Sequence, residues 1–197
     1  MSTDCTNNFM DPMKFVDSLD TKKHVVLVYD DQSFGKMIQF RFISNGLKNG
    51  ENCIYLTHGD PETIKTEMDE SGIDVKEFVQ KNILHIQQIS SPEKDPKGIL
   101  VGYENIIKQV TTDRKPPYRI VGRMMPSIGQ EVAMSVQIAI ERLTHAIFEN
   151  LNSTVLCEYD FNEIPTKDHK MWLGRLYSHH HAAIVSTRSG IAMADYL

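Results

Sequence analysis

Short apolar runs that alternate with helical patterns constrain the fold of this 197-residue chain more than any other feature. The runs are too short to be helices, and turn residues or amphipathic segments separate them along the chain. Strands that alternate with helices in this way predict a parallel sheet with helices on both faces. The expected strands are Val25–Tyr29, Cys53–Thr57, Ile83–Gln88, Tyr118–Met124, Thr154–Tyr159 and Ala182–Ser186.

The segments between these strands repeat apolar residues at helical spacing. The longest of them carries Val132, Val136, Ile140, Leu143 and Ile147. The length of the chain, without an internal repeat or a linker, predicts one domain over residues 20–197, preceded by a partly disordered N-terminal arm over residues 1–19. The expected helices are Pro12–Leu19, Phe34–Asn49, Glu62–Ser71, Asp74–Lys81, Ile99–Thr112, Ile128–Asn150 and Thr166–Tyr177.

Composition restricts the classes of function. The net charge of −5 argues against direct binding to nucleic acid or to an anionic membrane, because both need a basic surface. No apolar run reaches the ~18 residues of a membrane span, and the polar N-terminus lacks a signal sequence. We therefore expect the protein to reside in the cytoplasm. The cysteines, Cys5, Cys53 and Cys157, are spaced too widely for a disulfide framework or a paired-cysteine metal site.

The segment after the first expected strand is where a nucleotide-binding protein would carry its phosphate-binding loop. Such a loop needs glycines that let backbone amides cradle phosphate, and a lysine followed by a hydroxyl that reaches Mg²⁺. Only Gly35 and Lys36 fit, because Asp30 stands at the first glycine position and Met37 at the hydroxyl position. Asp30 and Asp31 would also repel an anionic nucleotide. We interpret Gly35 and Lys36 as a vestigial cofactor-binding motif and predict no bound cofactor.

Three segments resemble known families. Residues 42–56 are similar to the start of the RecA/KaiC-like ATPase core, and Thr154–Asp160 and His179–Val185 resemble the closing half of the MEDS domain. This is the sensory domain named for methanogens, methylotrophs and a dichloromethane regulator. The similarity extends over residues 20–197. It implies a single RecA/KaiC-like α/β domain that has lost its phosphate loop, and a non-catalytic role in sensing and signal transduction.

The resemblance also implies how a signal would leave the domain. It suggests a separate protein partner, such as a histidine kinase or a transcription regulator, and makes a homo-oligomer reasonable. One departure is Arg123, where family members often carry an acidic residue. No Asp or Glu lies between Tyr118 and Gln130, so the acid that holds magnesium in an ATPase is missing too. The missing hydroxyl and the missing acid together argue against ATP hydrolysis.

Ligands of an open parallel sheet bind beyond the carboxyl ends of its strands. We therefore expect a pocket for a small ligand of unknown identity at that edge, with Arg123 pairing with Asp30 or with an anionic ligand. Asp30 and Asp31 could equally cap the following helix, as we expect of Asp60, and His58 could be an ordinary loop histidine. The candidate ligand-binding residues are Tyr29, Asp30, Asp31, His58, Arg123, Cys157, Tyr159, Asp160 and His181.

Two alternatives to a non-catalytic sensor stay open. One is a residual nucleotide-binding, ATPase-like protein that uses Lys36. The other is a metal- or redox-responsive protein built on Cys157 and the run His179–His181. Consecutive residues that enter a strand alternate in direction, so at most His179 and His181 share one side, which is short of the ligands that zinc needs. We therefore predict neither a metal site nor a catalytic residue.

Overall fold

The computed structural model describes residues 10–20, 22–147, 150–187 and 192–196. Within these residues, seven strands form one sheet in the order β3-β2-β4-β5-β1-β6-β7. All neighbours pair in parallel except β6 and β7, which are antiparallel. The predicted α/β fold with a mostly parallel sheet is therefore confirmed. The strands are β1 His24–Tyr29, β2 Asn52–Thr57, β3 Leu84–Gln88, β4 Tyr118–Val121, β5 Ser153–Asp160, β6 Ala182–Ser186 and β7 Ala192–Tyr196.

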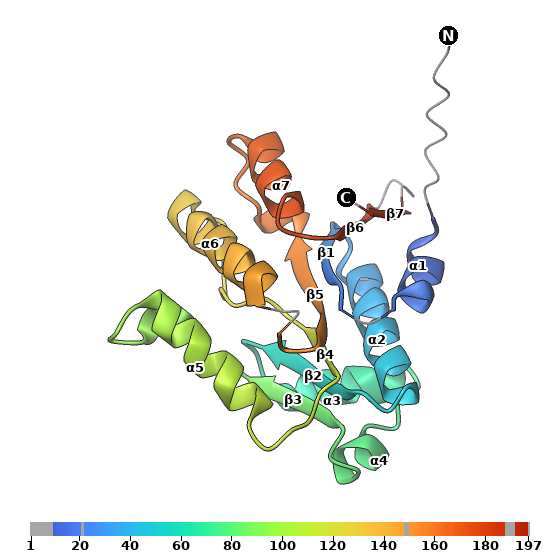
Figure 1. The fold of residues 1–197 in the computed structure, drawn as a ribbon. Helices are drawn as coiled ribbons and strands as arrows, with labels where there is room; N and C mark the ends of the chain where they lie inside the picture. Colours follow the sequence, from blue (N-terminus) through green and yellow to red (C-terminus); the bar gives the residue numbers. More distant parts are fainter. Residues whose placement is uncertain (1–9, 21, 148–149, 188–191, 197) are drawn as a thin grey trace.

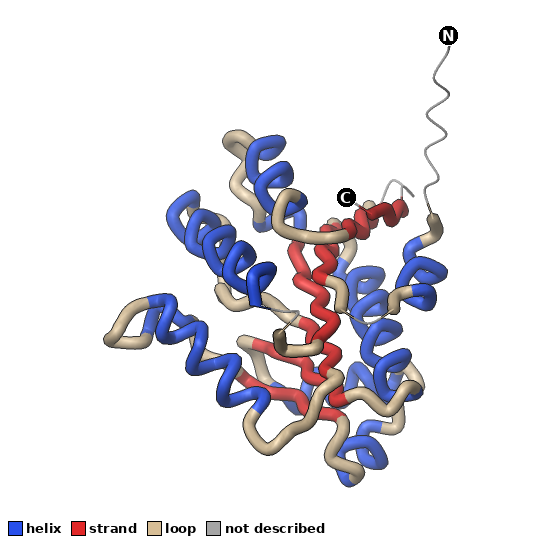
Figure 2. The backbone as a smooth tube through the Cα atoms, in the orientation of Figure 1, coloured by secondary structure: helices blue, strands red, loops and turns tan. Residues whose placement is uncertain are grey.

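Helices cover both faces of the sheet, as predicted (Figures 1 and 2). Helices α1 to α4 lie on one face and α5 to α7 on the other, and each set buries its own apolar cluster against the strands. The helices are α1 Pro12–Ser18, α2 Gln32–Lys48, α3 Pro61–Glu70, α4 Val75–Gln80, α5 Ile99–Thr111, α6 Glu131–Ile147 and α7 His169–Tyr177, with short 3-10 turns η1 Pro92–Lys94 and η2 Phe161–Glu163.

Strand β1 shows why the sheet is buried on both sides. Val25 and Leu27 point into the cluster under α2, whereas Val26 and Val28 point into the cluster under α6 and α7. All four are at most 2% exposed. A strand that alternates between two apolar layers reads as a continuous hydrophobic run, and this is the pattern of β1 in the sequence.

Helix α1 belongs to the folded layer. Asp11 caps its first turn by accepting hydrogen bonds from the backbone amides of Met13 and Lys14, at 3.0 and 3.1 Å. Phe15 and Val16 are each 1% exposed and lie in the same cluster as α2. The sequence predicted that this helix belongs to a partly disordered N-terminal arm. In the structure, the apolar face of the helix packs against the rest of the domain. Residues 1–9 of that arm lie outside the described residues.

Some elements differ from the sequence prediction. Strand β4 ends at Val121 because Gly122 has φ +145°, so Arg123 lies beyond the strand. Strand β7 was not predicted at all. Helix α6 begins at Glu131. Of the apolar residues predicted to share its inner face, Ile140 is buried and Val136, Leu143 and Ile147 pack partly buried against the core, whereas Val132 is 75% exposed. The side chains that α6 buries are Met134, Gln137, Ile140, Glu141 and Thr144.

Helix α5 makes a close backbone contact that predicts a measurable effect. A Cβ on Gly102 would lie 2.3 Å from the carbonyl oxygen of Pro92, an atom that cannot rotate away. We expect Gly102→Ala to lower the free energy of unfolding by about 1–3 kcal/mol, the usual result of overpacking. The measurement is the urea midpoint at constant m-value.

Gly174 in α7 is the matched control, because a Cβ there would meet no atom within 4 Å. Gly174→Ala should raise stability by roughly 0.5–1 kcal/mol, since alanine favours a helix. If Gly102→Ala had the same free energy of unfolding as Gly174→Ala, the close approach of Gly102 to the Pro92 carbonyl would be contradicted.

Candidate functional site

A polar cavity of about 160 Å³ lies where β1, β2 and β5 end, under the first turns of α2. It is at the carboxyl ends of parallel strands, where an open α/β sheet binds its ligands. We call it the edge cavity. The residues that line it are Tyr29, Lys36, Gln39, Tyr55, Leu56, Thr57, His58, Arg123, Pro126 and Glu158. Three of the predicted ligand-binding residues, Tyr29, His58 and Arg123, are thus brought together here.

Two buried donors that line the edge cavity lack acceptors among the described residues. Gln39 is 1% exposed, and its Oε1 accepts a hydrogen bond from the Tyr55 hydroxyl while its Nε2 has no partner. Arg123 donates from Nη2 to the Pro126 carbonyl at 3.2 Å, and its Nε has no partner. An unsatisfied buried donor costs about 1–3 kcal/mol. Both residues belong to the wall of the edge cavity.

The charges around the edge cavity are paired in part. Arg123 Nη1 lies 2.7 Å from Glu163 Oε2, whereas the sequence suggested Asp30 as its partner. Lys36 Nζ lies 3.0 Å from Glu67 Oε2 and donates to the Tyr55 hydroxyl at 3.3 Å.

Glu158 places a carboxyl group on the cavity wall and accepts a hydrogen bond from the Tyr29 hydroxyl at 2.6 Å. Burial raises the pKa of Glu158, although Arg123 opposes the shift. Two cationic side chains, Arg123 and Lys36, thus line the cavity with this one carboxyl group.

His58 holds the far side of the edge cavity in place. Its Nδ1 lies 3.1 Å from the carbonyl of Ile89, after β3, and its Nε2 lies 3.2 Å from the carbonyl of Arg123. Burial lowers its pKa, which favours the neutral ring at pH 7. A neutral ring has one N–H, so it can donate to only one of the two carbonyls at a time.

Three acidic candidates serve as caps. Asp31 accepts hydrogen bonds from the amides of Ser33 and Phe34 at the start of α2. Asp160 accepts one from the amide of Asn162 in η2 at 2.8 Å. Asp60 caps α3, as expected. The backbone amide of Asp30 donates to the carbonyl of Ser186, which joins the end of β1 to β6.

The Gly35 and Lys36 pair lies inside a helix. Strand β1 ends at Tyr29 and Asp31 already caps α2, so the chain has no room there for a phosphate-cradling loop. Gly35 faces the Tyr29 ring, and a Cβ on it would lie 2.7 Å from that ring. The glycine therefore serves packing at this position, and the lysine that follows it reaches the edge cavity.

A second polar group lies on the opposite face of the sheet, under α6 and α7. His24 at the start of β1, Glu141 of α6, Cys157 of β5 and His180 before β6 bring their ligand-type atoms within 4.8 Å of one another. All four are at most 5% exposed. We call this group the His–Cys–Glu cluster. Cys157 is next to Glu158 in β5, so the cluster and the edge cavity lie on opposite faces of one strand.

Glu141 is the centre of this cluster. Its Oε2 lies 3.2 Å from His24 Nε2, 3.4 Å from His180 Nε2 and 3.2 Å from Cys157 Sγ. Its Oε1 accepts hydrogen bonds from Tyr159 and Gln137. The sequence predicted that Tyr159 binds a ligand, whereas in the structure its hydroxyl donates a hydrogen bond to Glu141.

Burial shapes the protonation states of the cluster. Burial raises the pKa of Glu141, but the two histidines outweigh it and hold that pKa well below its ordinary value. Burial lowers the pKa of His24 to about 4. The Cys157 thiol has a strongly raised pKa, first from burial and then from Glu141, so it is not a ready nucleophile.

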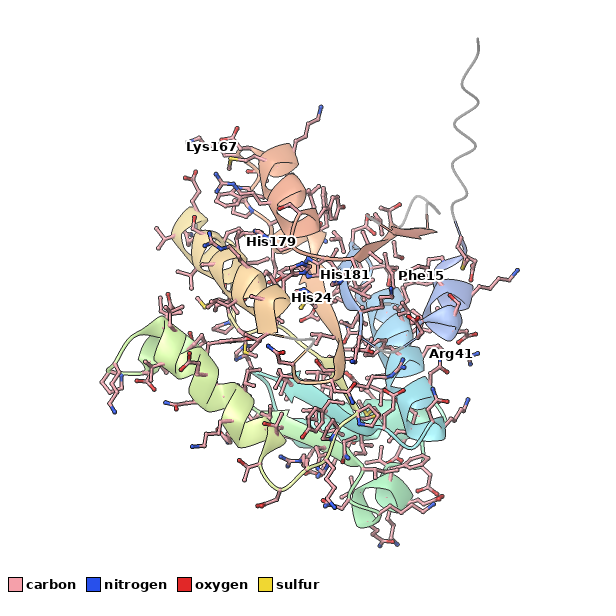
Figure 3. All side chains as sticks on the ribbon, in the orientation of Figure 1. Phe15, His24, Arg41, Lys167, His179 and His181 are labelled. Atoms are coloured by element: carbon pink, nitrogen blue, oxygen red, sulfur yellow. The ribbon has the colours of Figure 1, made fainter. Side chains whose placement is uncertain are left out.

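The run His179–His181 contributes differently from what the sequence suggested. His180 reaches the cluster, whereas the expectation paired His179 with His181. His181 accepts a hydrogen bond at Nδ1 from the backbone amide of His24 at 3.1 Å, and its ring stacks on His145 at 4.7 Å. The His179 carbonyl accepts from His24 Nδ1 at 2.8 Å. Figure 3 shows His24, His179 and His181 gathered between α6, α7 and β6.

The comparisons with known proteins give the family. Residues 23–172 match the model of the MEDS domain, the MEthanogen/methylotroph, DcmR Sensory domain. The chain belongs to the MEDS family. The match covers most of the chain and includes the residues of the edge cavity, together with three of the four members of the His–Cys–Glu cluster. A sensory role follows from the family.

The fold of this MEDS domain is also that of a KaiC-like protein from the hyperthermophilic archaeon Pyrococcus horikoshii. The two structures align with a TM-score of 0.58 and 17% sequence identity, over 87% of this chain and 76% of the other. At that identity the likeness shows the fold alone. A search of curated proteins finds no match. None of the helices in the described residues is long and apolar enough to span a membrane.

Sequence reasoning missed several residues that the structure brings into this MEDS site. Gln39, Tyr55 and Glu158 line the edge cavity, and His24 and Glu141 join the cluster. Gln137, Glu141 and Thr144 recur at helical spacing in α6, and this polar pattern was the available signal for Glu141. No comparable pattern marks His24, which is a polar residue at the start of an apolar strand.

Proposed function

We propose that this MEDS domain is a non-catalytic sensor that binds a small oxyanion, such as a short carboxylate, in the edge cavity. The observation that carries the proposal is the pair of buried donors without acceptors, Gln39 Nε2 and Arg123 Nε. A carboxylate has two oxygens and about four lone-pair sites, so one such group has enough acceptors for both donors. Hydrogen bonds to a charged group are also stronger than neutral ones.

The size of the edge cavity supports a small ligand. Pockets for drug-sized molecules occupy about 300–1,000 Å³, whereas this cavity has a volume of about 160 Å³. A nucleoside triphosphate exceeds that space, and a molecule of a few heavy atoms fits it. Arg123 and Lys36 supply the positive charge that would face an anionic ligand, beside the Glu163 and Glu67 carboxylates with which they pair.

The bound state would reach a partner through the elements that the ligand joins. Gln39 belongs to α2, and Arg123 belongs to the segment that connects β4 to α6. An oxyanion held by both would tie α2 to this connection, and so bias any equilibrium between arrangements of the two. A histidine kinase, a transcription regulator or a second copy of the chain would read the change. Residence in the cytoplasm remains part of this proposal.

The second candidate function is that of a residual nucleotide-binding ATPase. The short connection between β1 and α2 argues against this function. Only Asp30 and Asp31 separate β1 from the first helical residue of α2, and both are acidic. A phosphate loop needs several backbone amides that point at one anion. We therefore expect no response to Mg-ATP.

A thermal-shift panel tests the proposed sensor. It contains formate, acetate, propionate, chloroacetate and Mg-ATP at matched ionic strength. A ligand at 100 times its dissociation constant should stabilise the fold by about 2.7 kcal/mol, which raises Tm by roughly 5–11 °C for a chain of this length. We expect one or more carboxylates to produce this shift, and Lys36→Gln to weaken their binding about tenfold or more.

Lys65→Gln is the matched control, because the side chains of Lys36 and Lys65 are both 34% exposed and both pair with a glutamate. Lys65 lies on α3 and does not line the edge cavity. Lys65→Gln should therefore leave the affinity for carboxylates unchanged. The contrary result would be a rise in Tm with Mg-ATP that Lys36→Gln abolishes, with no change in Tm for any carboxylate. That result would favour the ATPase over the sensor.

A further inference from the structure

The two histidines of the His–Cys–Glu cluster present the same nitrogen to its centre. His24 Nδ1 lies 2.8 Å from the carbonyl of His179, and His180 Nδ1 lies 2.6 Å from the carbonyl of Leu176. A carbonyl can only accept, so each Nδ1 carries the proton and donates it. Each Nε2 of a neutral ring is therefore an unprotonated lone pair that faces Glu141 and Cys157.

This arrangement is the one that metal-binding histidines use. Their second ring nitrogen almost always donates to a backbone carbonyl or a carboxylate, which fixes the ring and its tautomer. His180 Nε2 also lacks a hydrogen-bond partner among the described residues, although it is buried and lies 3.4 Å from Glu141 Oε2. A carboxylate oxygen and an imidazole lone pair that face each other in a buried site need a cation between them, which is either a proton or a metal ion.

Hydrogen bonds also orient the Glu141 carboxylate toward the centre of the cluster. Gln137 and Tyr159 donate to Oε1, at 2.7 Å for Gln137, which leaves Oε2 directed at the two histidines and Cys157. Gln137 is fixed in turn, since its Oε1 accepts from the amide of Met125. The carboxylate is therefore held by a second layer of hydrogen bonds, as ligands of bound metals are.

The distances suit four ligands around one ion. A tetrahedron with metal–ligand bonds of about 2.0–2.3 Å has edges of roughly 3.3–3.8 Å. In the cluster, the separations from Glu141 Oε2 are 3.2 Å to His24, 3.2 Å to Cys157 and 3.4 Å to His180, and all four atoms lie within 4.8 Å of one another.

Charge also balances. A divalent ion, the Glu141 carboxylate and the Cys157 thiolate sum to zero, and the histidines bind as neutral rings. The complex could then be buried without a net charge, which a site with only 0–5% exposure requires. Binding breaks the S–H bond of Cys157 and releases that proton to solvent as the metal–sulfur bond forms.

We propose that His24, Glu141, Cys157 and His180 bind one divalent transition metal, with zinc as the first candidate. Two imidazoles, a thiolate and a carboxylate are all zinc ligands, and four protein ligands make a closed site of the structural kind. The ion would join β1, α6, β5 and the segment before β6. This site is separate from the edge cavity, and neither proposal depends on the other.

Cobalt provides the test, because a thiolate bound to tetrahedral Co²⁺ gives a sulfur-to-metal charge-transfer band. The full chain, purified without a histidine tag, is produced in medium with added Co²⁺, since a buried site is loaded during folding. We expect about one metal ion per chain by elemental analysis, and the thiolate band. Wild-type protein that folds without stoichiometric metal and without the band would overturn the proposal.

Two cysteine variants locate the site. Cys53 is also buried, but its Sγ lies near only the backbone carbonyls of Ile43 and Glu51, at 3.6 Å each. Cys53→Ser should keep the band, whereas Cys157→Ser should abolish it and weaken metal binding by more than about 100-fold. Circular dichroism confirms the fold of each variant. A folded Cys157→Ser protein that retains the band would exclude Cys157 as a ligand.

Discussion

Arg119→Met is expected to lower the free energy of unfolding by about 3–5 kcal/mol, enough to unfold a marginally stable domain at 37 °C. Arg119 is 1% exposed in the middle of β4, and it donates from Nε and Nη2 to the two carboxylate oxygens of Glu51, each at 2.9 Å. Its guanidinium also stacks over the Phe42 ring at 4.7 Å. Removal of the arginine would leave the Glu51 carboxylate buried without a counter-ion.

The double variant Arg119→Met, Glu51→Leu separates the loss of the pair from the loss of packing. Replacing a whole buried ion pair by apolar residues is often neutral or better, so we expect the double variant to regain most of the stability. The measurement is urea unfolding of both variants and the wild type. A loss below about 1 kcal/mol for Arg119→Met would contradict the buried pair.

Glu141→Leu is expected to cost a similar 3–5 kcal/mol. The leucine would leave Gln137 Nε2, the Tyr159 hydroxyl and the Cys157 thiol without the carboxylate to which they donate, all in a buried site. A buried donor left without an acceptor costs about 1–3 kcal/mol, and the Tyr159 hydroxyl loses its acceptor outright, whereas Gln137 keeps its hydrogen bond to that hydroxyl. Unfolding is measured with EDTA present, so that the result reports the hydrogen-bond network and not a bound metal.

Glu131→Leu is the control on the same helix. Glu131 has a side chain that is 55% exposed, and its only ion pair among the described residues, with Lys167, has a separation of 3.5 Å. A surface change of this kind should stay within about 0.5 kcal/mol. If Glu141→Leu were equally mild, the buried network would have no energetic weight and the account of the cluster would fail.

The layers of the fold could be predicted from sequence because apolar periodicity encodes them directly. The six parallel strands and the helices between them follow from short apolar runs and helical spacing. Helix α6 shows the limit of this reasoning. The predicted apolar face was correct from Val136 to Ile147, but Val132 is 75% exposed and the buried face also includes Gln137 and Glu141. Periodicity of apolar residues cannot find a face whose polar residues are buried together.

The candidate sites were predictable only in their location. The carboxyl-edge rule brought Tyr29, His58 and Arg123 to one cavity. It could not find Gln39, which lies on α2 eight residues into the helix and looks like an ordinary surface glutamine in the sequence. It also could not find His24, because the partners of His24 are separated from it by more than 100 residues along the chain. Such contacts depend on tertiary packing.

The side-chain NMR signals of Gln39 and Arg123 test the central claim most directly. In ¹⁵N-labelled protein, the Gln39 amide and the Arg123 Nε–H report the two buried donors that lack acceptors. The account predicts that a short carboxylate shifts both signals along one saturable curve with a single Kd, and that Mg-ATP shifts neither. If both signals stayed fixed with every carboxylate, or moved with Mg-ATP alone, the edge cavity would not be an oxyanion site.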